Sequence, residues 1–174
     1  LGSDSSMYGG VGTASAELEG GIIVAAMVVC NAWGDVVNPR LGMIVAGARD
    51  PNAPKAFVDT ERYICSRRTL DTRYFGMDTT LCVVATDAAL SSEQITKVAM
   101  MAQDGIARAV RPAHTIYDGD VVFALSLGRK TDAIVDVNII GAFAARLIEE
   151  AIVRGVCYGN NLPPEGYGEE TQPY

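Results

Sequence analysis

The chain has 174 residues, of which 49% are hydrophobic and 20% charged, so it is long enough and apolar enough for one domain with a sizeable core. Its 14 basic and 21 acidic residues give a net charge of −7, which argues against nucleic acid and anionic membrane surfaces as partners. A single histidine and four cysteines without Cys-x-x-Cys spacing leave little for a zinc site, so we expect no metal and no cofactor. The sequence shows no signal peptide and no run of about 20 apolar residues, which favours a cytoplasmic location.

Three apolar runs predict strands that are buried on both faces, because each run is continuous and bounded by polar residues. They occupy residues 21–30, 79–87 and 121–127. Residues 1–8 are mostly small and polar, and they predict a tail. Residues 38–76 combine Gly, Pro and mixed charges with weak periodicity, so they predict a long surface loop with room for one short helical turn.

Two amphipathic helices complete the predicted fold. The first begins with a serine N-cap at position 91 or 92 and carries apolar residues at helical spacing to about Val110. The second covers residues 132–154, with Gly155 at its C-terminal end. Residues 157–174 contain several Pro and Gly residues and no core pattern, so they predict a mobile tail. Strands, a helix, a strand and a helix in this order indicate a single domain of the mixed α/β class, residues 1–174.

Thr79 and Thr80 open the central apolar run, directly after the turn-prone residues 75–78. If the chain were cut between Asp78 and Thr79, Thr79 would carry a free α-amino group beside its own hydroxyl. An α-amine titrates at about pH 7.7–8.0 in model peptides, so it can act as the base for that hydroxyl at neutral pH. The commoner explanation of two threonines here is that they simply open a core strand, because β-branched residues favour strands.

Four distinctive blocks occur in order along the chain. The first three are Gly-Gly-Val-Gly-Thr-Ala-Ser at 9–15, Val-Val-Cys-Asn-Ala-Trp-Gly-Asp-Val-Val-Asn-Pro at 28–39 and Thr-Thr-Leu-Cys-Val-Val-Ala-Thr-Asp-Ala at 79–88. The fourth consists of Asp-Gly-Ile-Ala-Arg at 104–108, Arg-Pro-Ala-His-Thr at 111–115 and Asp-Gly-Asp at 118–120. Together they resemble the L-aminopeptidase/D-amino-acid esterase-amidase family, which includes β-peptidyl aminopeptidases, a pantetheine hydrolase and a nylon-oligomer hydrolase. Members of that family extend further at the N-terminus, so the chain resembles their C-terminal half.

The resemblance implies an α/β fold, the α-β-β-α sandwich of the N-terminal-nucleophile hydrolase-like type found in the aminopeptidase/ornithine-acetyltransferase superfamily. Thr79 would begin a central strand of this fold as the nucleophile. Self-cleavage between Asp78 and Thr79 would divide the chain into residues 1–78 and 79–174.

Three further residues receive roles from the resemblance. Asn31 would donate from its side-chain amide to the oxyanion of acyl transfer, which is worth roughly 3–4 kcal/mol; on sequence alone it fits a turn equally well. Asp118 and Asp120 would help to orient the nucleophile, and two carboxylates two apart on extended backbone point to the same face. From spacing alone, Asp-Gly is ordinary turn chemistry, and the other ligand positions of a calcium loop are absent.

The function implied by the resemblance is a self-processing amidohydrolase or aminopeptidase that cleaves small amides or peptide N-termini through a threonyl ester. The alternatives are an acyl-transferase of the ornithine-acetyltransferase type and a non-catalytic fragment or subunit. The resemblance also implies homo-oligomers and an additional N-terminal chain or segment. The sequence departs from the family pattern at Tyr8, where lysine is common, and at Asp78, where asparagine is usual.

Overall fold

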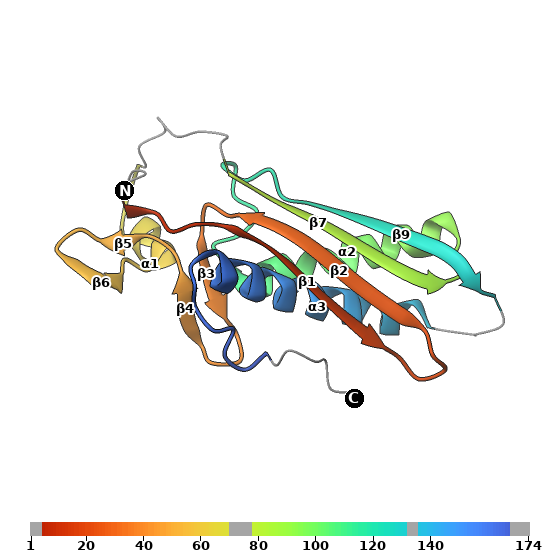
Figure 1. Ribbon diagram of the computed structural model, residues 1–174. Helices are drawn as coiled ribbons and strands as arrows, with labels where there is room; N and C mark the ends of the chain where they lie inside the picture. Colours follow the sequence, from red (N-terminus) through yellow and green to blue (C-terminus); the bar gives the residue numbers. More distant parts are fainter. Residues whose placement is uncertain (1–4, 70–77, 132–135, 168–174) are drawn as a thin grey trace.

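The computed structural model describes residues 5–69, 78–131 and 136–167 of the chain. In chain order the elements are β1 (Gly10–Glu17), β2 (Ile23–Asn31), β3 (Asp35–Asn38), β4 (Met43–Ala46), β5 (Arg49–Asp50), β6 (Ala53–Phe57), α1 (Thr60–Cys65), β7 (Thr79–Ala88), α2 (Ser92–Ala109), β8 (Val110–Arg111), β9 (Val121–Lys130) and α3 (Val137–Gly159) (Figure 1).

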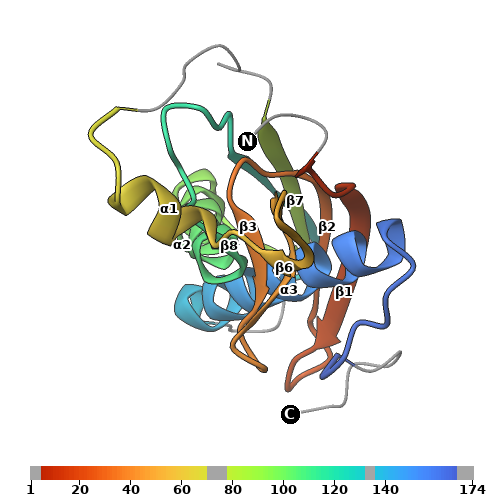
Figure 2. The same cartoon turned by 90° about the vertical axis from the view of Figure 1, so that its left-hand side faces the viewer.

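Four strands form the main sheet in the order β1-β2-β7-β9. β2 runs antiparallel to both β1 and β7, whereas β7 and β9 run parallel. Parallel neighbours need a crossover connection, and α2 supplies it between β7 and β9. α2 and α3 pack against each other on the same side of the sheet (Figures 1 and 2). The described residues therefore form one sheet layer covered by one helical layer, with smaller sheets at one end.

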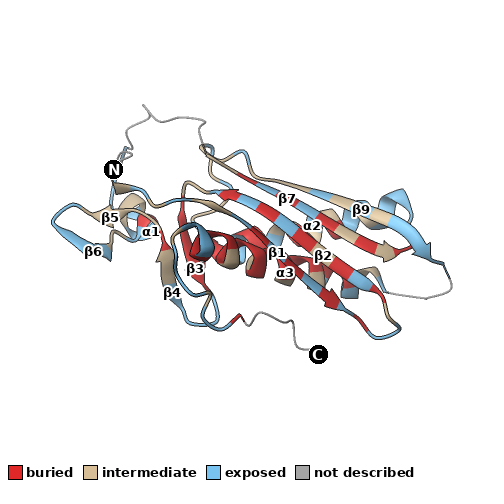
Figure 3. Cartoon of the chain, viewed as in Figure 1, coloured by how far each residue is buried: buried red, intermediate tan, exposed pale blue. Residues whose placement is uncertain are grey.

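The strands of the main sheet are buried on one face only, so the prediction of burial on both faces was wrong for this part of the chain. In β2, Val24 and Val28 are fully buried, whereas Met27 is 50% exposed. The alternation continues along β7, and Phe123 of β9 is 57% exposed (Figure 3). The apolar runs are continuous because both faces of these strands are apolar, although the described residues cover only one of them.

Helix α2 follows the prediction closely. Ser91 is the N-cap, and it forms a capping box with Gln94. The buried stripe consists of Val98, Ala102, Gly105, Ile106 and Ala109. Gly105 allows a close crossing with α3, since a Cβ atom at this position would overlap the carbonyl oxygen of Ala145. The two helices thus share an interface in which backbone approaches backbone.

Helix α3 extends beyond its predicted end. It begins after the N-cap Asp136 and continues through Gly155 to Gly159. Gly155 does not end the helix because it lies against β1, where Cβ atoms at Gly10 and Gly12 would overlap carbonyl oxygens of α3. The glycines of the first sequence block therefore let β1 lie directly on this helix. None of the described helices is long and apolar enough to cross a membrane.

The described part of residues 38–76 contains strands β4 to β6, which corrects the prediction of a surface loop, whereas helix α1 confirms the one short helical turn predicted there. β3 pairs with β4 and β8 in a small sheet, and β5 pairs with β6 ahead of α1. Asp35 of β3 is 2% exposed, and its carboxylate accepts hydrogen bonds from the backbone N–H groups of Ala48 and Thr60 and from the Thr60 hydroxyl. A buried polar contact rather than apolar periodicity joins these elements, so sequence patterns miss them. Residues 70–77 lie outside the described residues.

Residues 157–167 pack against the rest of the protein although they lack an apolar pattern. Residues 157–159 form the end of α3, and Tyr167 is 3% exposed. The Tyr167 hydroxyl donates to Glu149 at 2.9 Å, and the guanidinium of Arg40 lies 3.9 Å from the centre of the Tyr167 ring. One aromatic side chain thus anchors this segment. The remainder of the predicted tail, 168–174, lies outside the described residues.

Burial distinguishes the four cysteines and predicts which thiol reacts. Burial raises the pKa of Cys30 to about 11 and that of Cys82 to about 12, and it also raises the pKa of Cys157. Cys65 is exposed. Because the thiolate is the reactive form, we expect iodoacetamide to modify Cys65 alone in the native protein at mildly alkaline pH, as read by peptide mass spectrometry. Cys65→Ser should remain unlabelled, and labelling of Cys30 or Cys82 before unfolding would contradict the core packing.

Candidate active site

The pairing of β2 with β7 brings Asn31 and Thr79 together. The two residues are directly opposite in the antiparallel register, a position in which Cβ atoms lie about 4.5–5.5 Å apart. Their neighbours Cys30 and Thr80 are buried towards the helices, so alternation puts Asn31 and Thr79 on the outward face of the sheet. Asn31 is the last residue of β2 rather than a turn residue. The predicted nucleophile and the predicted oxyanion donor therefore share one end of one sheet face.

The bond between Asp78 and Thr79 lies beside the hydroxyl that is predicted to attack it. Thr79 Oγ1 donates to the carbonyl oxygen of Asp78 at 2.6 Å. The backbone N–H of Gly119 donates to the same oxygen at 3.0 Å. Asp78 also forms a parallel bridge with Asp118, which continues the register of β7 and β9 three residues before the Leu81–Val121 pair. This carbonyl group thus has two donors and a fixed position at the start of β7, an inner strand of the main sheet.

The Asp118 carboxylate holds two loops together. One oxygen accepts the backbone N–H of Trp33 at 3.1 Å. The other accepts the hydroxyl of Thr115 at 2.7 Å and the backbone N–H of the same residue at 3.3 Å. Asp118 therefore fixes the loop after β2 to the loop before β9, next to the bond that precedes Thr79.

The Asp120 carboxylate fixes the other side of the site. Its Oδ1 accepts the backbone N–H of Thr80 at 2.9 Å, directly after the predicted nucleophile. Its Oδ2 lies 3.1 Å from His114 Nδ1 and accepts the His114 backbone N–H at 3.3 Å. The Asp120 side chain is only 3% exposed. The structure thus brings Asp118 and Asp120 beside Thr79, where each carboxylate accepts hydrogen bonds from the backbone.

Asp78 itself carries a carboxyl group in an unfavourable position. Burial raises the pKa of Asp78, and the neighbouring Asp118 carboxylate raises it further. The ionised form of Asp78 is therefore disfavoured in the folded chain. Among the described residues, no group of three His, Cys, Asp or Glu side chains is placed to hold a metal ion.

Two aromatic residues that the sequence analysis did not select stand next to these groups. The rings of Trp33 and Tyr117 are 5.1 Å apart between centroids, at an interplanar angle of 32°. Trp33 is bonded to Asp118 through its backbone, and Tyr117 precedes Asp118 in the chain. The sequence signal that could have identified them is their position close to the predicted site residues Asn31 and Asp118. The pair gives the site an apolar border.

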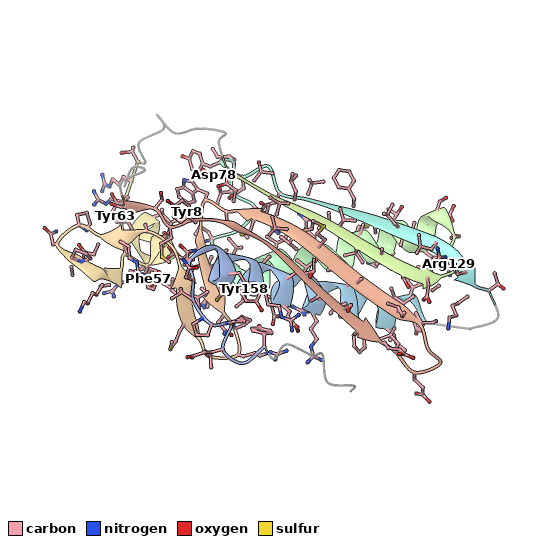
Figure 4. The ribbon with its side chains drawn as sticks, in the orientation of Figure 1. Tyr8, Phe57, Tyr63, Asp78, Arg129 and Tyr158 are labelled. Atoms are coloured by element: carbon pink, nitrogen blue, oxygen red, sulfur yellow. The ribbon has the colours of Figure 1, made fainter. Side chains whose placement is uncertain are left out.

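Tyr8 lies at the same end of the sheet as Asp78 (Figure 4). Its backbone N–H and carbonyl groups are both bonded to the side-chain amide of Asn160, at 3.1 and 2.8 Å. The Tyr8 side chain is 79% exposed. Asn160, at the C-terminal end of α3, therefore fixes the backbone of Tyr8, while the Tyr8 side chain remains in solvent.

Solved structures with a similar fold define its class. One is the PH0078 protein from Pyrococcus horikoshii, with a TM-score of 0.52 and 22% identity over 84% of this chain and 39% of that one. Another is the L-aminopeptidase D-Ala-esterase/amidase from Ochrobactrum anthropi, described as a new variant of the N-terminal-nucleophile hydrolase fold, with a TM-score of 0.51 and 20% identity over 85% of this chain and 40% of that one. The fold is thus of the N-terminal-nucleophile hydrolase type, as predicted.

Sequence comparison gives the family. Residues 4–167 match peptidase family S58. An uncharacterized aminopeptidase of Mycobacterium leprae is 45% identical over 128 residues, 70% of this chain and 33% of that protein. One of Mycobacterium tuberculosis is 37% identical over 170 residues, 86% of this chain and 48% of that protein. The chain belongs to peptidase family S58, which confirms the resemblance, and it spans between a third and a half of the length of these relatives.

The raised pKa of Asp78 predicts a pH-dependent gain in stability when its charge is removed. Above that pKa the ionised carboxylate opposes folding, and below the unfolded value it is neutral in both states. In a Thr79→Ala background, Asp78→Asn should therefore raise the thermal midpoint at neutral pH, and the gain should shrink as the pH falls. Asp104→Asn, on the exposed side of α2, is the control for loss of one negative charge. An equal midpoint shift for both variants at neutral pH would contradict the assigned environment.

Proposed function

We propose that this chain is the catalytic part of a self-processing amidohydrolase or aminopeptidase that acts on small amides or peptide N-termini. The single observation that supports the proposal most strongly is the 2.6 Å contact between the Thr79 hydroxyl and the carbonyl oxygen of Asp78. A nucleophile at that distance is already beside the carbon it must attack. Membership of peptidase family S58 agrees with this chemistry.

Processing would give Thr79 a free α-amino group that can act as the base for its own hydroxyl. Cleavage before Thr79 would release its α-amino group, which titrates at about pH 7.7–8.0 in model peptides. The free amine would then take the hydroxyl proton when Thr79 attacks a substrate. The same amine could return the proton to the leaving group, and water would hydrolyse the threonyl ester.

Asn31 would stabilise the negative oxygen that forms during substrate turnover. It stands directly opposite Thr79 in the β2–β7 register, on the same sheet face. A donor held by a strand needs no reorganisation when charge develops on the substrate oxygen. The adjacent Trp33–Tyr117 pair favours substrates with an apolar group beside the scissile amide.

A further protein layer would cover the outward face of the main sheet. Met27, Leu81 and Phe123 are 45–57% exposed on this face, which is more apolar surface than a free sheet usually presents. The face ends at Asn31 and Thr79, so a layer placed on it would also border the site. The relatives are two to three times as long as the matched part of this chain, and we assign the covering layer to an N-terminal chain or segment of the same protein. Homo-oligomers would then form through other surfaces.

Self-processing predicts two fragments with a defined boundary. Intact-mass analysis and N-terminal sequencing should find residues 1–78 and 79–174, with Thr79 as the new N-terminus. Thr79→Ala should stay uncut because it lacks the attacking hydroxyl. Thr80→Ala, whose side chain faces the core, is the matched control and should still be cut. A new terminus at Thr80, or an uncut chain in the complete protein, would refute the assignment of Thr79.

The Asn31 role predicts a catalytic defect without unfolding. Asn31→Ala in the processed protein should lower kcat by roughly 100- to 1000-fold on a chromogenic amino-acid amide, because one oxyanion donor is lost. Its thermal midpoint should stay close to that of the parent, since Asn31 is exposed at the end of β2. Asn52→Ala, in the exposed connection between β5 and β6, should change neither quantity. Full activity in Asn31→Ala would show that Asn31 has a structural role and does not act as an oxyanion donor.

A further inference from the structure

The carbonyl oxygen of Asp78 has two donors, and only one of them can act throughout self-cleavage. The Thr79 hydroxyl donates to this oxygen at 2.6 Å, and the Gly119 backbone N–H donates at 3.0 Å. When the hydroxyl attacks, its oxygen lone pair must turn towards the carbonyl carbon and its proton must leave. The hydroxyl can no longer stabilise the carbonyl oxygen at that moment. The Gly119 N–H remains in place as the oxygen becomes negative.

Position 119 requires glycine because a side chain there would crowd the Thr79 hydroxyl, and not because of its backbone conformation. Gly119 is not among the described glycines with positive φ, so another residue could adopt its conformation. A Cβ atom at this position, however, would lie 2.8 Å from Thr79 Oγ1 and 3.6 Å from Thr79 Cγ2. That separation is closer than normal contact and would push the hydroxyl away from the Asp78 carbonyl. The missing side chain therefore leaves room for the nucleophile.

The residues on both sides of Gly119 keep its N–H fixed. Asp118 is tied to Trp33 and Thr115 through its carboxylate. Asp120 is tied to the Thr80 backbone N–H, immediately after the nucleophile. The peptide unit between them cannot easily rotate while these bonds persist. A donor held in this way is already oriented before charge develops, which is the condition for effective oxyanion stabilisation.

We propose that Gly119 is a catalytic residue of the self-cleavage step, in which its backbone N–H stabilises the oxyanion formed at the Asp78 carbonyl. The inference rests on the proposed processing at Thr79. Thr79 Oγ1 forms a bond to the Asp78 carbonyl carbon, the C–N bond to Thr79 breaks, and the hydroxyl proton ends on the Thr79 nitrogen. The product is an ester with a free amine. Water then adds to the ester carbon and breaks the C–O bond, which leaves a carboxylic acid on Asp78 and restores the Thr79 hydroxyl.

The most direct test replaces the amide of Gly119 by an ester. Glycolic acid incorporated at position 119 of the full-length protein removes the N–H without adding a Cβ atom. Processing, followed by intact mass against time, should slow by roughly 100- to 1000-fold, as for loss of one oxyanion donor. The matched control is lactic acid in place of Ala89, whose N–H donates to the Lys130 carbonyl at 3.3 Å, away from the site. That variant should be processed at the rate of the parent.

A second variant keeps the donor and tests the space. Gly119→Ala retains the N–H but crowds Thr79 Oγ1, so its processing should also slow while its circular dichroism spectrum stays native. If the ester variant does not fold, processing of Gly119→Ala at the parent rate would show that the Gly119 peptide does not control the geometry of the attack. Processing of the ester variant at the parent rate would overturn the oxyanion role of the Gly119 N–H and leave the proposed function intact. Processing of the alanine variant at the parent rate would contradict the close approach of Gly119 to the Thr79 hydroxyl. A parent chain that is never cut at Thr79 would instead refute both.

Discussion

The antiparallel register between β2 and β7 is the constraint on which the rest of the site depends. It sets Asn31 directly opposite Thr79 and, one step further along, Cys30 opposite Thr80. Because side chains alternate along a strand, a shift of one residue would turn Thr79 towards the helices and Thr80 towards solvent. Burial of the apolar core face prevents such a shift, with Val28 and Val84 among the fully buried residues. Core packing therefore fixes the position of the predicted nucleophile.

The carboxylates next to Thr79 act on the backbone in this structure. Asp118 and Asp120 accept hydrogen bonds from the loops around them and from the strand that follows the nucleophile. This arrangement accounts for two acidic residues beside the bond that we propose is cleaved. They orient the Gly119 peptide between them. Burial raises the pKa of Asp78, and the nearby Asp118 carboxylate raises it further. The Asp-Gly-Asp segment thus positions the Gly119 peptide and also brings negative charge close to Asp78.

Much of this arrangement could be predicted from the sequence, and the exceptions have physical reasons. The apolar runs and helical stripes identified β2, β7, α2 and β9 because local periodicity determines these elements. The family resemblance selected Asn31, Thr79, Asp118 and Asp120, which the structure brings to one end of one sheet. The elements β3 to β6 were missed because they are short and depend on the buried Asp35. The sequence did not predict that α3 continues through Gly155. This glycine lies inside the helix because β1 packs closely against it, and such a tertiary contact leaves no local sequence pattern. Gly119 was read only as part of a turn, since its two roles depend on the distant Asp78 and Thr79.

In the self-cleavage that we propose, the Thr79 hydroxyl attacks the Asp78 carbonyl and forms an ester. Hydroxylamine added to freshly refolded protein tests this claim most directly, because it cleaves an ester and leaves a hydroxamate on the acyl side. We expect a fragment of residues 1–78 that ends in a hydroxamate at Asp78, together with residues 79–174 with a free Thr79 amine. Cleavage that yields only the carboxylic acid at Asp78 under trapping conditions, or trapping at another residue, would contradict it.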